Sequence, residues 1–316
     1  MILKDLEQKA TRQGYGDGLM EIAHNEKVVV MSADLTESTK TNMFEKAHPE
    51  RFFQCGVAEQ NMVGMAAGLA LSGKIPFVST FGAFVPIRVL DQIRVSVCYP
   101  NLNVKFGSTH TGLTVGKDGA THQVLEDIAV MRVLPNMRVI VPCDYEETKK
   151  AVHHAAVMKG PVYIRMGRSK LPVITKKSTP FHPGRAETFR KGKDVTIVAC
   201  GIMVYTALKA AEELEKQGIS AEVINNHTIK PMDEEKIVKS AKKTGCIVTA
   251  EEHQINGGLG SAVSEVMAKH LPVPMEFVAV KDTFGESGNP DELLKKYHLT
   301  ESDIVAAVRK VVKRKS

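Results

Sequence analysis

The chain has 316 residues, of which 25% are charged and 43% apolar, and it carries a net charge of +6. This balance is typical of a globular protein and excludes a disordered chain, while no apolar run approaches the ~18 residues of a membrane span. Residues 1–7 lack the apolar core of a signal peptide, and the five cysteines are too far apart for a CxxC pair or a zinc site. We therefore predict a cytoplasmic protein with reduced cysteines, no metal ligands of its own, and neither nucleic acid nor membrane as a partner.

Strand-like and helix-like segments alternate along the chain, which is typical of parallel α/β folds. The first half contains predicted strands at residues 28–31, 75–79, 102–106, 138–141 and 161–165. A polar segment at 174–193 interrupts this pattern, which resumes with a strand at 194–201. Helices at 205–217, 234–243 and 259–270 then alternate with strands at 220–225 and 246–251. We predict two parallel-sheet α/β domains, at residues 1–174 and 194–316, joined by a linker at 175–193.

The sequence GVAEQNM (residues 56–62) puts Glu59 near the start of a long stretch of apolar and small residues. A carboxylate in such surroundings loses water and needs a partner that shares its proton or donates a hydrogen bond. Taken alone, Glu59 could instead complement the dipole or cap the first turn of a helix. The strand-like residues 75–80 then lead to Phe81 and Phe84, whose three-residue spacing puts two rings on one side, where they could hold a flat ring.

A glycine-rich sequence, THTGLTVGKDGATHQ (residues 109–123), carries His110, Asp118 and His122. Such loops at strand ends place side chains over a cofactor, although each histidine alone could be a loop residue with no role. In this order and spacing, GVAEQNM, STFGAF (79–84) and this loop resemble the pyrimidine-binding domain of thiamine diphosphate enzymes, most closely the transketolase family. Residues 194–316, including DTFGESG (282–288), are similar to the transketolase C-terminal domain, so the resemblance covers nearly the whole chain.

The resemblance implies which residues contact thiamine diphosphate. Glu59 would hydrogen-bond N1′ of the aminopyrimidine and so favour the tautomer that removes the thiazolium C2 proton. Phe84 would stack on the pyrimidine beside Phe81, and Asp34 would lie near the cofactor. Ile87 stands where the family often has an aromatic residue, so Phe81 and Phe84 would have to carry the ring contact.

The resemblance also implies which residues contact the sugars. His110 and His122 would bond the ketose oxygens and move protons, since a histidine of ordinary pKa both donates and accepts protons near neutral pH. Asp118 would contact the C2 hydroxyl of the acceptor aldose, although Lys117 beside it stands where an acid is frequent in the family.

A sugar phosphate needs an anion site at the far end of the channel. Arg165 leaves the strand predicted at 161–165, where its planar fork could take a phosphate, and Arg168 is a weaker candidate. Without the resemblance, a structural ion pair would explain a strand-end arginine equally well. Ser38 matches a second phosphate contact of the family.

Gly16-Asp17-Gly18, with Asn42 further on, imitates the GDG…N signature that binds diphosphate and magnesium in thiamine enzymes. A working GDG closes a hydrophobic strand, whereas residues 8–15 are polar and helical in character, so we do not interpret it as a metal site. The chain then resembles the C-terminal half of a split transketolase. A separate N-terminal subunit carrying GDG…N would bind the diphosphate and Mg²⁺, in a heterotetramer with two chains of each type.

The expected reaction is transfer of a two-carbon ketol unit from a ketose phosphate to an aldose phosphate, as in the pentose phosphate pathway. Two related enzymes remain as alternatives: the β-subunit of a 2-oxo acid dehydrogenase, which usually shows His-Ser-Gln where this chain has Thr121-His122-Gln123, and deoxyxylulose phosphate synthase, normally one chain with its own metal site. A non-catalytic scaffold subunit is a third alternative, although Glu59, His110 and His122 are all present.

Overall fold

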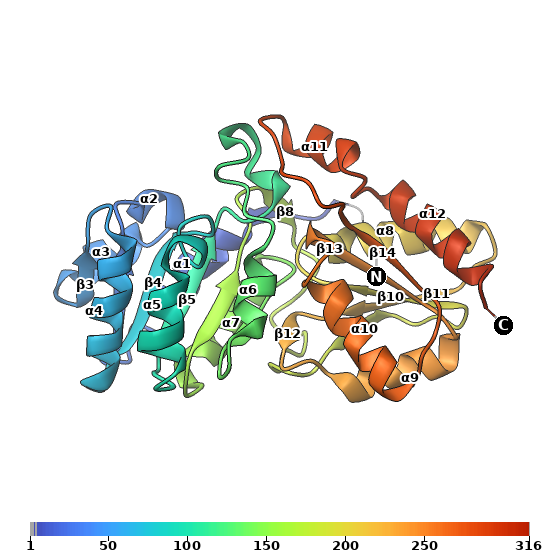
Figure 1. The fold of residues 1–316 in the computed structure, drawn as a ribbon. Coiled ribbons are helices and arrows are strands. Elements are labelled where there is room, and N and C mark those ends of the chain that lie inside the picture. Colours follow the sequence, from blue (N-terminus) through green and yellow to red (C-terminus); the bar gives the residue numbers. More distant parts are fainter. Residues whose placement is uncertain (1–2, 4, 316) are drawn as a thin grey trace.

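The protein, described by a computed structural model, contains two α/β units that lie side by side (Figure 1). The structure describes residue 3 and residues 5–315; residues 1, 2, 4 and 316, part of the predicted domain ends, lie outside it. Within the described residues, the first unit holds a seven-stranded sheet in which every neighbouring pair is parallel except β12 with β6. Its strands, in sheet order, are β12 (Thr228–Lys230), β6 (Arg138–Ile140), β7 (Val162–Arg165), β5 (Lys105–Thr109), β4 (Ile75–Phe81), β2 (Val28–Ser32) and β3 (Phe52–Gln54).

Helices cover both faces of this sheet, which explains why β2, β4 and β5 are buried along their whole length. One face packs against α1 (Thr11–Glu21) and α7 (Tyr145–Val157), and the other against α4 (Glu59–Leu71), the π-helix η3 (Ile93–Cys98) and α6 (Asp127–Val133). Shorter helices connect these elements: α2 (Thr36–Thr39), α3 (Asn42–Ala47), η1 (Pro49–Arg51), η2 (Ile87–Val89), α5 (Leu90–Gln92) and η4 (Leu113–Asp118).

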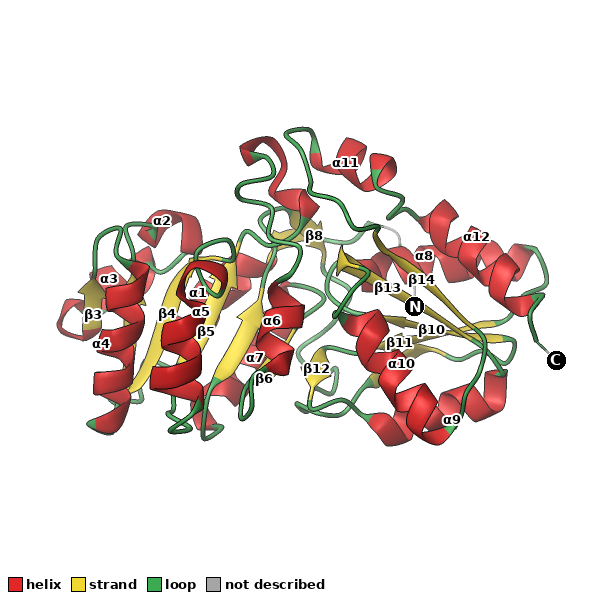
Figure 2. Cartoon of the chain, viewed as in Figure 1, coloured by secondary structure: helices red, strands yellow, loops and turns green. Residues whose placement is uncertain are grey.

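The second unit is built around a five-stranded sheet, again counted within the described residues, with helices on both faces (Figure 2). Its strands, in sheet order, are β14 (Met275–Val280), β13 (Ile247–Gln254), β10 (Val195–Ala199), β11 (Ala221–Asn225) and the antiparallel β9 (Glu187–Arg190). Its helices are α8 (Met203–Lys216), α9 (Glu234–Thr244), α10 (Leu259–His270), α11 (Pro290–Lys296) and α12 (Glu301–Val312). A small antiparallel ribbon joins β1 (Gln8–Ala10) to β8 (Lys170–Pro172).

The two units share one continuous apolar core. A single cluster of buried residues extends from α4 and α6 of the first unit to α9 and α10 of the second, through residues such as Val63, Ile128, Ile237 and Val263. The chain also crosses back, because β12 follows β11 in sequence but completes the edge of the first sheet. β9 lies inside the segment that we predicted as a linker. The units are therefore packed as one body, and the second can influence the first directly.

The α/β architecture and the alternation of elements are confirmed. One predicted strand is displaced from 102–106 to β5 at Lys105–Thr109, because Leu102 still bonds through its amide to the carbonyl of Val97 in the preceding turn. All five cysteines are free, and four of them are buried. None of the helices in the described part of the chain is long and apolar enough to cross a membrane.

The GDG sequence lies inside helix α1, as its polar neighbours predict. A Cβ at Gly16 would meet the Lys40 carbonyl at 2.3 Å, and one at Gly18 would meet Val152 at 3.0 Å, so close packing explains both glycines. The Asp17 carboxylate accepts hydrogen bonds from Gln13 and Tyr145. The motif is therefore accounted for by helix packing and by hydrogen bonds within the protein.

Candidate active site

The predicted site residues follow the carboxyl ends of neighbouring strands in the first sheet. Ligands of open parallel sheets bind at this edge. Glu59 follows β3, and Asp34 and Ser38 follow β2. Phe81 is the last residue of β4, and Phe84 follows it. His110, Asp118 and His122 follow β5, and Arg168 follows β7. The sheet thus brings together residues that are more than 130 positions apart in the sequence.

Glu59 begins helix α4 and is 3% exposed. Its Oε2 accepts a hydrogen bond from Nη1 of Arg88 at 3.0 Å, whereas its Oε1 is buried and has no hydrogen-bond partner. The sequence analysis required a hydrogen-bond partner for this carboxylate, and the structure supplies one to Oε2 but not to Oε1. Because a buried polar atom without a partner is costly, the free Oε1 is suited to a donor supplied by a ligand.

Four rings form an aromatic cluster beside Glu59. Phe81 stacks on His110 with ring centres 3.8 Å apart and lies 5.8 Å from the nearly parallel Phe84, whose ring meets the edge of His122 at 5.6 Å. The Arg88 guanidinium lies 4.4 Å from the centre of Phe84. One planar group, the guanidinium of Arg88, therefore contacts both the Phe84 ring and the Glu59 carboxylate.

His110 has an unusual backbone conformation and an unusually low pKa. It is 3% exposed, its φ of 55° lies in the left-handed region that few non-glycine residues adopt, and its Nδ1 lies 2.9 Å from the Thr109 hydroxyl. Burial lowers the pKa of His110 to about 3, with further contributions from Arg12, Arg168 and His122. The expectation of an ordinary pKa is therefore wrong for this histidine, which is neutral near pH 7.

Two arginines converge beside His110, and the sequence analysis missed one of them. Arg12 donates from Nη1 to the carbonyl of Ser38 at 2.9 Å, and its Nε is buried without a partner. Arg168 donates to the carbonyl of Val115 at 2.7 Å and lies 3.6 Å from the Asp118 carboxylate. Burial, and then the charge of Arg168, lower the pKa of Arg12. Two neighbouring cations with an unused donor favour an anion between them.

Arg165, our first choice for the phosphate, is placed differently from the exposed strand end that we expected. It is 5% exposed, its Nε donates to Asp127 at 2.8 Å, and its Nη2 donates to the carbonyl of Glu252 at 2.9 Å. Burial alone would lower the pKa of Arg165, but the carboxylates of Asp127 and Glu252 raise it further than burial lowers it. Its fork is thus occupied within the protein, and of the two arginines predicted for the phosphate only Arg168 is half-exposed.

Three further positions discussed in the sequence analysis are exposed or partly exposed residues around the candidate site. Asp34 is exposed with a φ of 59°, and its amide bonds to the Gln54 side chain at 2.7 Å. Ile87 is 36% exposed next to Arg88, and Lys117 is exposed on the loop between the two histidines. Among the described residues, no three His, Cys, Asp or Glu side chains are placed to hold a metal ion.

Comparisons with known proteins identify the family. The sequence-family model of the transketolase pyrimidine-binding domain matches residues 7–173, and that of the transketolase C-terminal domain matches residues 184–304. This chain belongs to the transketolase family, and its two units are these two domains. Membership implies dependence on thiamine diphosphate.

Individual relatives support the same assignment. The 6-deoxy-6-sulfo-D-fructose transketolase subunit of Clostridium sp. is 45% identical and is matched over 98% of this chain and 97% of its own length. Human transketolase is 38% identical over 96% of this chain, which spans 49% of the human protein. A structure described as a split gene transketolase in an inactive beta4 tetramer is 53% identical, with a TM-score of 0.92 over 98% of this chain and all of that chain.

Proposed function

We propose that this chain is the C-terminal subunit of a split, cytoplasmic transketolase, which transfers a two-carbon ketol unit from a ketose phosphate to an aldose phosphate. The observation that carries the proposal is the pairing of Glu59, with one buried and unpartnered oxygen, and Phe84 within reach of one planar group. This is the environment that an aminopyrimidine requires, because its ring nitrogen would share a proton with the carboxyl group of Glu59. The alignment with human transketolase covers about half of that protein, which supports the need for a second subunit.

The residues present fit thiamine diphosphate on its pyrimidine side. Glu59 would share a proton with the ring nitrogen through Oε1, and Phe84 would stack on the ring, with Phe81 behind it. When bound, thiamine diphosphate supplies the nucleophilic carbon that carries the ketol unit between sugars. Asp34 would lie near the cofactor at the adjoining strand end, and the partner subunit would hold the diphosphate and Mg²⁺ through its GDG…N motif.

His110 and His122 would contact the oxygens of the sugar. Since His110 is buried and neutral near pH 7, it would serve first as an orienting hydrogen-bond group, with one nitrogen fixed by Thr109 and the other available. His122, less buried and bonded through Nδ1 to Thr121 at 2.9 Å, would move protons as carbon–carbon bonds break and form. Asp118 would contact the C2 hydroxyl of the acceptor aldose.

The anionic end of the sugar would bind between Arg12 and Arg168, close to Ser38. The unused Nε of Arg12 and the half-exposed fork of Arg168 supply the donors. Several relatives are named for different sugars, including 6-deoxy-6-sulfo-D-fructose and apulose 4-phosphate. Because a sulfonate and a phosphate both accept such hydrogen bonds, the donor sugar could carry either anion, and we propose a phosphate as the first substrate to test.

The outward face of α4 is the proposed contact with the partner subunit. Val57, two residues before this helix, and Leu71, its last residue, are 74% and 73% exposed, and Met65 between them is 39% exposed. Gly64 and Gly68 lie on the same face, with no atom within 4 Å of where a Cβ would stand, so another backbone could approach closely. Because Glu59 begins this helix, a subunit packed there would also close the aromatic cluster from solvent.

The proposal is tested by calorimetric titration of thiamine diphosphate, with Mg²⁺, into this chain alone, into the GDG-bearing subunit, and into their complex. We expect tight binding to the complex only, and Glu59→Gln in this chain should weaken it without dissociating the subunits. Equal binding to the GDG-bearing subunit with and without this chain would refute the shared site and favour a scaffold role.

A further inference from the structure

The loop that carries both site histidines is held from behind by the C-terminal domain. We call residues 110–123 the histidine loop. Gln123 donates from Nε2 to the carbonyl of Glu286 at 2.8 Å, and the Ser287 hydroxyl donates to the carbonyl of Lys117 at 2.6 Å. In Figure 1 the loop segment before α6 reaches the chain that leads into α11. The position of the site therefore depends on residues far from it in the sequence.

The most direct of these contacts comes from Glu252 on β13. Its Oε1 accepts a hydrogen bond from the amide of Thr114 at 2.6 Å. Its carboxylate also lies against Gly112, where a Cβ would stand 2.3 Å from the Glu252 Cδ, and Gly112 has a φ of 81°. The histidine loop thus has a glycine at the point where the Glu252 carboxylate contacts it, and a larger residue at position 112 would collide with that carboxylate.

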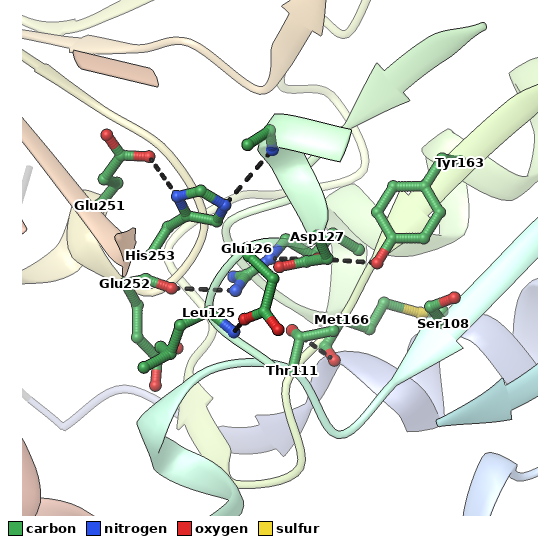
Figure 3. A network of polar contacts seen from close by, with 12 residues as sticks. Ser108, Thr111, Leu125, Glu126, Asp127, Tyr163, Met166, Glu251, Glu252 and His253 are labelled. Atoms are coloured by element: carbon green, nitrogen blue, oxygen red, sulfur yellow. Dashed lines mark hydrogen bonds and ion pairs between the residues drawn. The ribbon is translucent and has the colours of Figure 1, made fainter. Parts of the chain in front are cut away.

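Glu252 is itself fixed by a buried polar network. Its main-chain carbonyl accepts from Arg165, which donates to Asp127, and the same Asp127 oxygen accepts from the Tyr163 hydroxyl at 2.7 Å. Figure 3 shows Asp127 and Tyr163 on one side of this network and Glu252 on the other. The preceding residue, Glu251, accepts from the amides that begin α10. Residues on both sides of the contact are thus fixed. The main chain of Glu252 is bonded to Arg165 of the first domain, and Glu251 beside it is bonded to α10 of the second.

We propose that Glu252 is a positioning residue for ketol transfer, which fixes the histidine loop so that His110 and His122 face the bound sugar. This inference rests on the proposed function of the two histidines. Glu252 does not belong to the site and lies on the C-terminal domain, so the proposal gives that domain a part in catalysis through the loop.

The energetics of Glu252 favour positioning over simple stabilisation. Glu252 is 4% exposed, and burial raises the pKa of its carboxyl group to about 7, although Arg165 and the Thr114 amide lower it. Replacing a whole buried ion pair by apolar residues is often neutral or stabilising, so a buried carboxylate by itself is weak evidence of a stabilising role. Its contribution here is geometric, because its Oε1 accepts from the Thr114 amide at 2.6 Å while the same carboxyl group fills the space beside Gly112.

The test compares Glu252→Gln with two other variants. Gly112→Ala places a methyl group against the same carboxylate and serves as a second disturbance of the contact. Glu222→Gln is the matched control, since Glu222 is a buried carboxylate of the same domain, 3% exposed, that pairs with Lys243 away from the loop. Amide hydrogen exchange of the full-length chain and steady-state kinetics of its complex with the GDG-bearing subunit are measured for each.

We expect Glu252→Gln and Gly112→Ala to speed exchange of the Thr114 amide by about tenfold or more, and Glu222→Gln to leave it unchanged. In the complex, both loop variants should lower kcat by up to about 100-fold, with a much smaller change in KM. Unchanged loop exchange in folded Glu252→Gln, or faster exchange with kcat unchanged, would overturn the proposal. If wild type shows no ketol transfer, the proposed function fails, while the exchange result still decides whether Glu252 holds the loop.

Discussion

Arg88 donates a hydrogen bond from Nη1 to Oε2 of Glu59 at 3.0 Å while its guanidinium lies 4.4 Å from the centre of the Phe84 ring. These are the two residues that we assign to the pyrimidine of the cofactor. Arg88 therefore stabilises Glu59 in the free chain, and it would compete with a pyrimidine ring bound in the way that we propose. Because its side chain is 48% exposed, it has room to move away when the cofactor binds.

Arg88→Ala should affect stability and cofactor binding in opposite directions. Loss of the partially exposed partner of Glu59 should cost the free chain about 1 kcal/mol, measured by urea unfolding. The complex should bind thiamine diphosphate more tightly, because no side chain has to leave the ring position. Arg94→Ala, an exposed arginine of the same segment, is the control. Weaker cofactor binding by Arg88→Ala would show that Arg88 contacts the cofactor instead of competing with it.

Removing an arginine of the anion site should affect only substrates with an anionic group. Arg12→Ala or Arg168→Ala in the complex should raise KM for a sugar phosphate by about 10- to 100-fold, because each removes a charged hydrogen-bond donor. The corresponding unphosphorylated sugar should be used as well as by wild type. Arg185→Ala changes an exposed arginine paired with Glu235 and controls for charge. Equal losses on both sugars would argue against an anion site between Arg12 and Arg168.

His110 should make the chain sensitive to acid. Its pKa is about 3 when folded and about 6.5 when unfolded, so the unfolded state binds more protons between these values, and stability is lost as pH falls below about 6.5. The wild type should therefore lose about 2 kcal/mol more than His110→Gln between pH 7.5 and pH 5. Urea unfolding at both pH values measures this difference. Equal losses in the two proteins would mean that His110 titrates normally in the folded chain.

Asp127→Asn should destabilise the chain strongly. Asp127 is fully buried and accepts from both Arg165 and Tyr163, so its neutralisation deprives the buried Arg165 of the carboxylate that its Nε bonds to. We expect a loss of about 3–5 kcal/mol in the free energy of unfolding. The control, Glu235→Gln, breaks a pair whose side chains are 66% and 85% exposed and should cause no measurable loss. A small effect of Asp127→Asn would show that Arg165 finds another partner, or that water reaches it.

Short motifs of neighbouring residues were enough to predict several candidate site residues. Glu59, Phe84, His110 and His122 stand in short blocks whose residue types and spacing indicate a chemistry, and the parallel sheet brings these blocks to one edge. The alternation of apolar strands and helices likewise predicted the fold.

Tertiary contacts explain what the sequence could not show. Arg12 meets Ser38 across 26 positions, and Glu252 meets Thr114 across 138. Nothing near Arg165 in sequence reveals that Asp127, 38 positions away, occupies its fork. The pKa of His110 depends first on its burial and then on the charges of Arg12 and Arg168, which are distant from it in the sequence. β12 pairs with β6 although it lies in the second half of the chain.

The central claim is that this chain supplies one half of an active centre. The most direct test mixes the purified chain with the separately purified GDG-bearing subunit, adds thiamine diphosphate and Mg²⁺, and assays for sedoheptulose 7-phosphate from xylulose 5-phosphate and ribose 5-phosphate. We predict product from the mixture, from neither subunit alone, and not from a mixture containing Glu59→Gln that still assembles. Full activity of the Glu59→Gln mixture, or of the GDG-bearing subunit alone, would contradict the account.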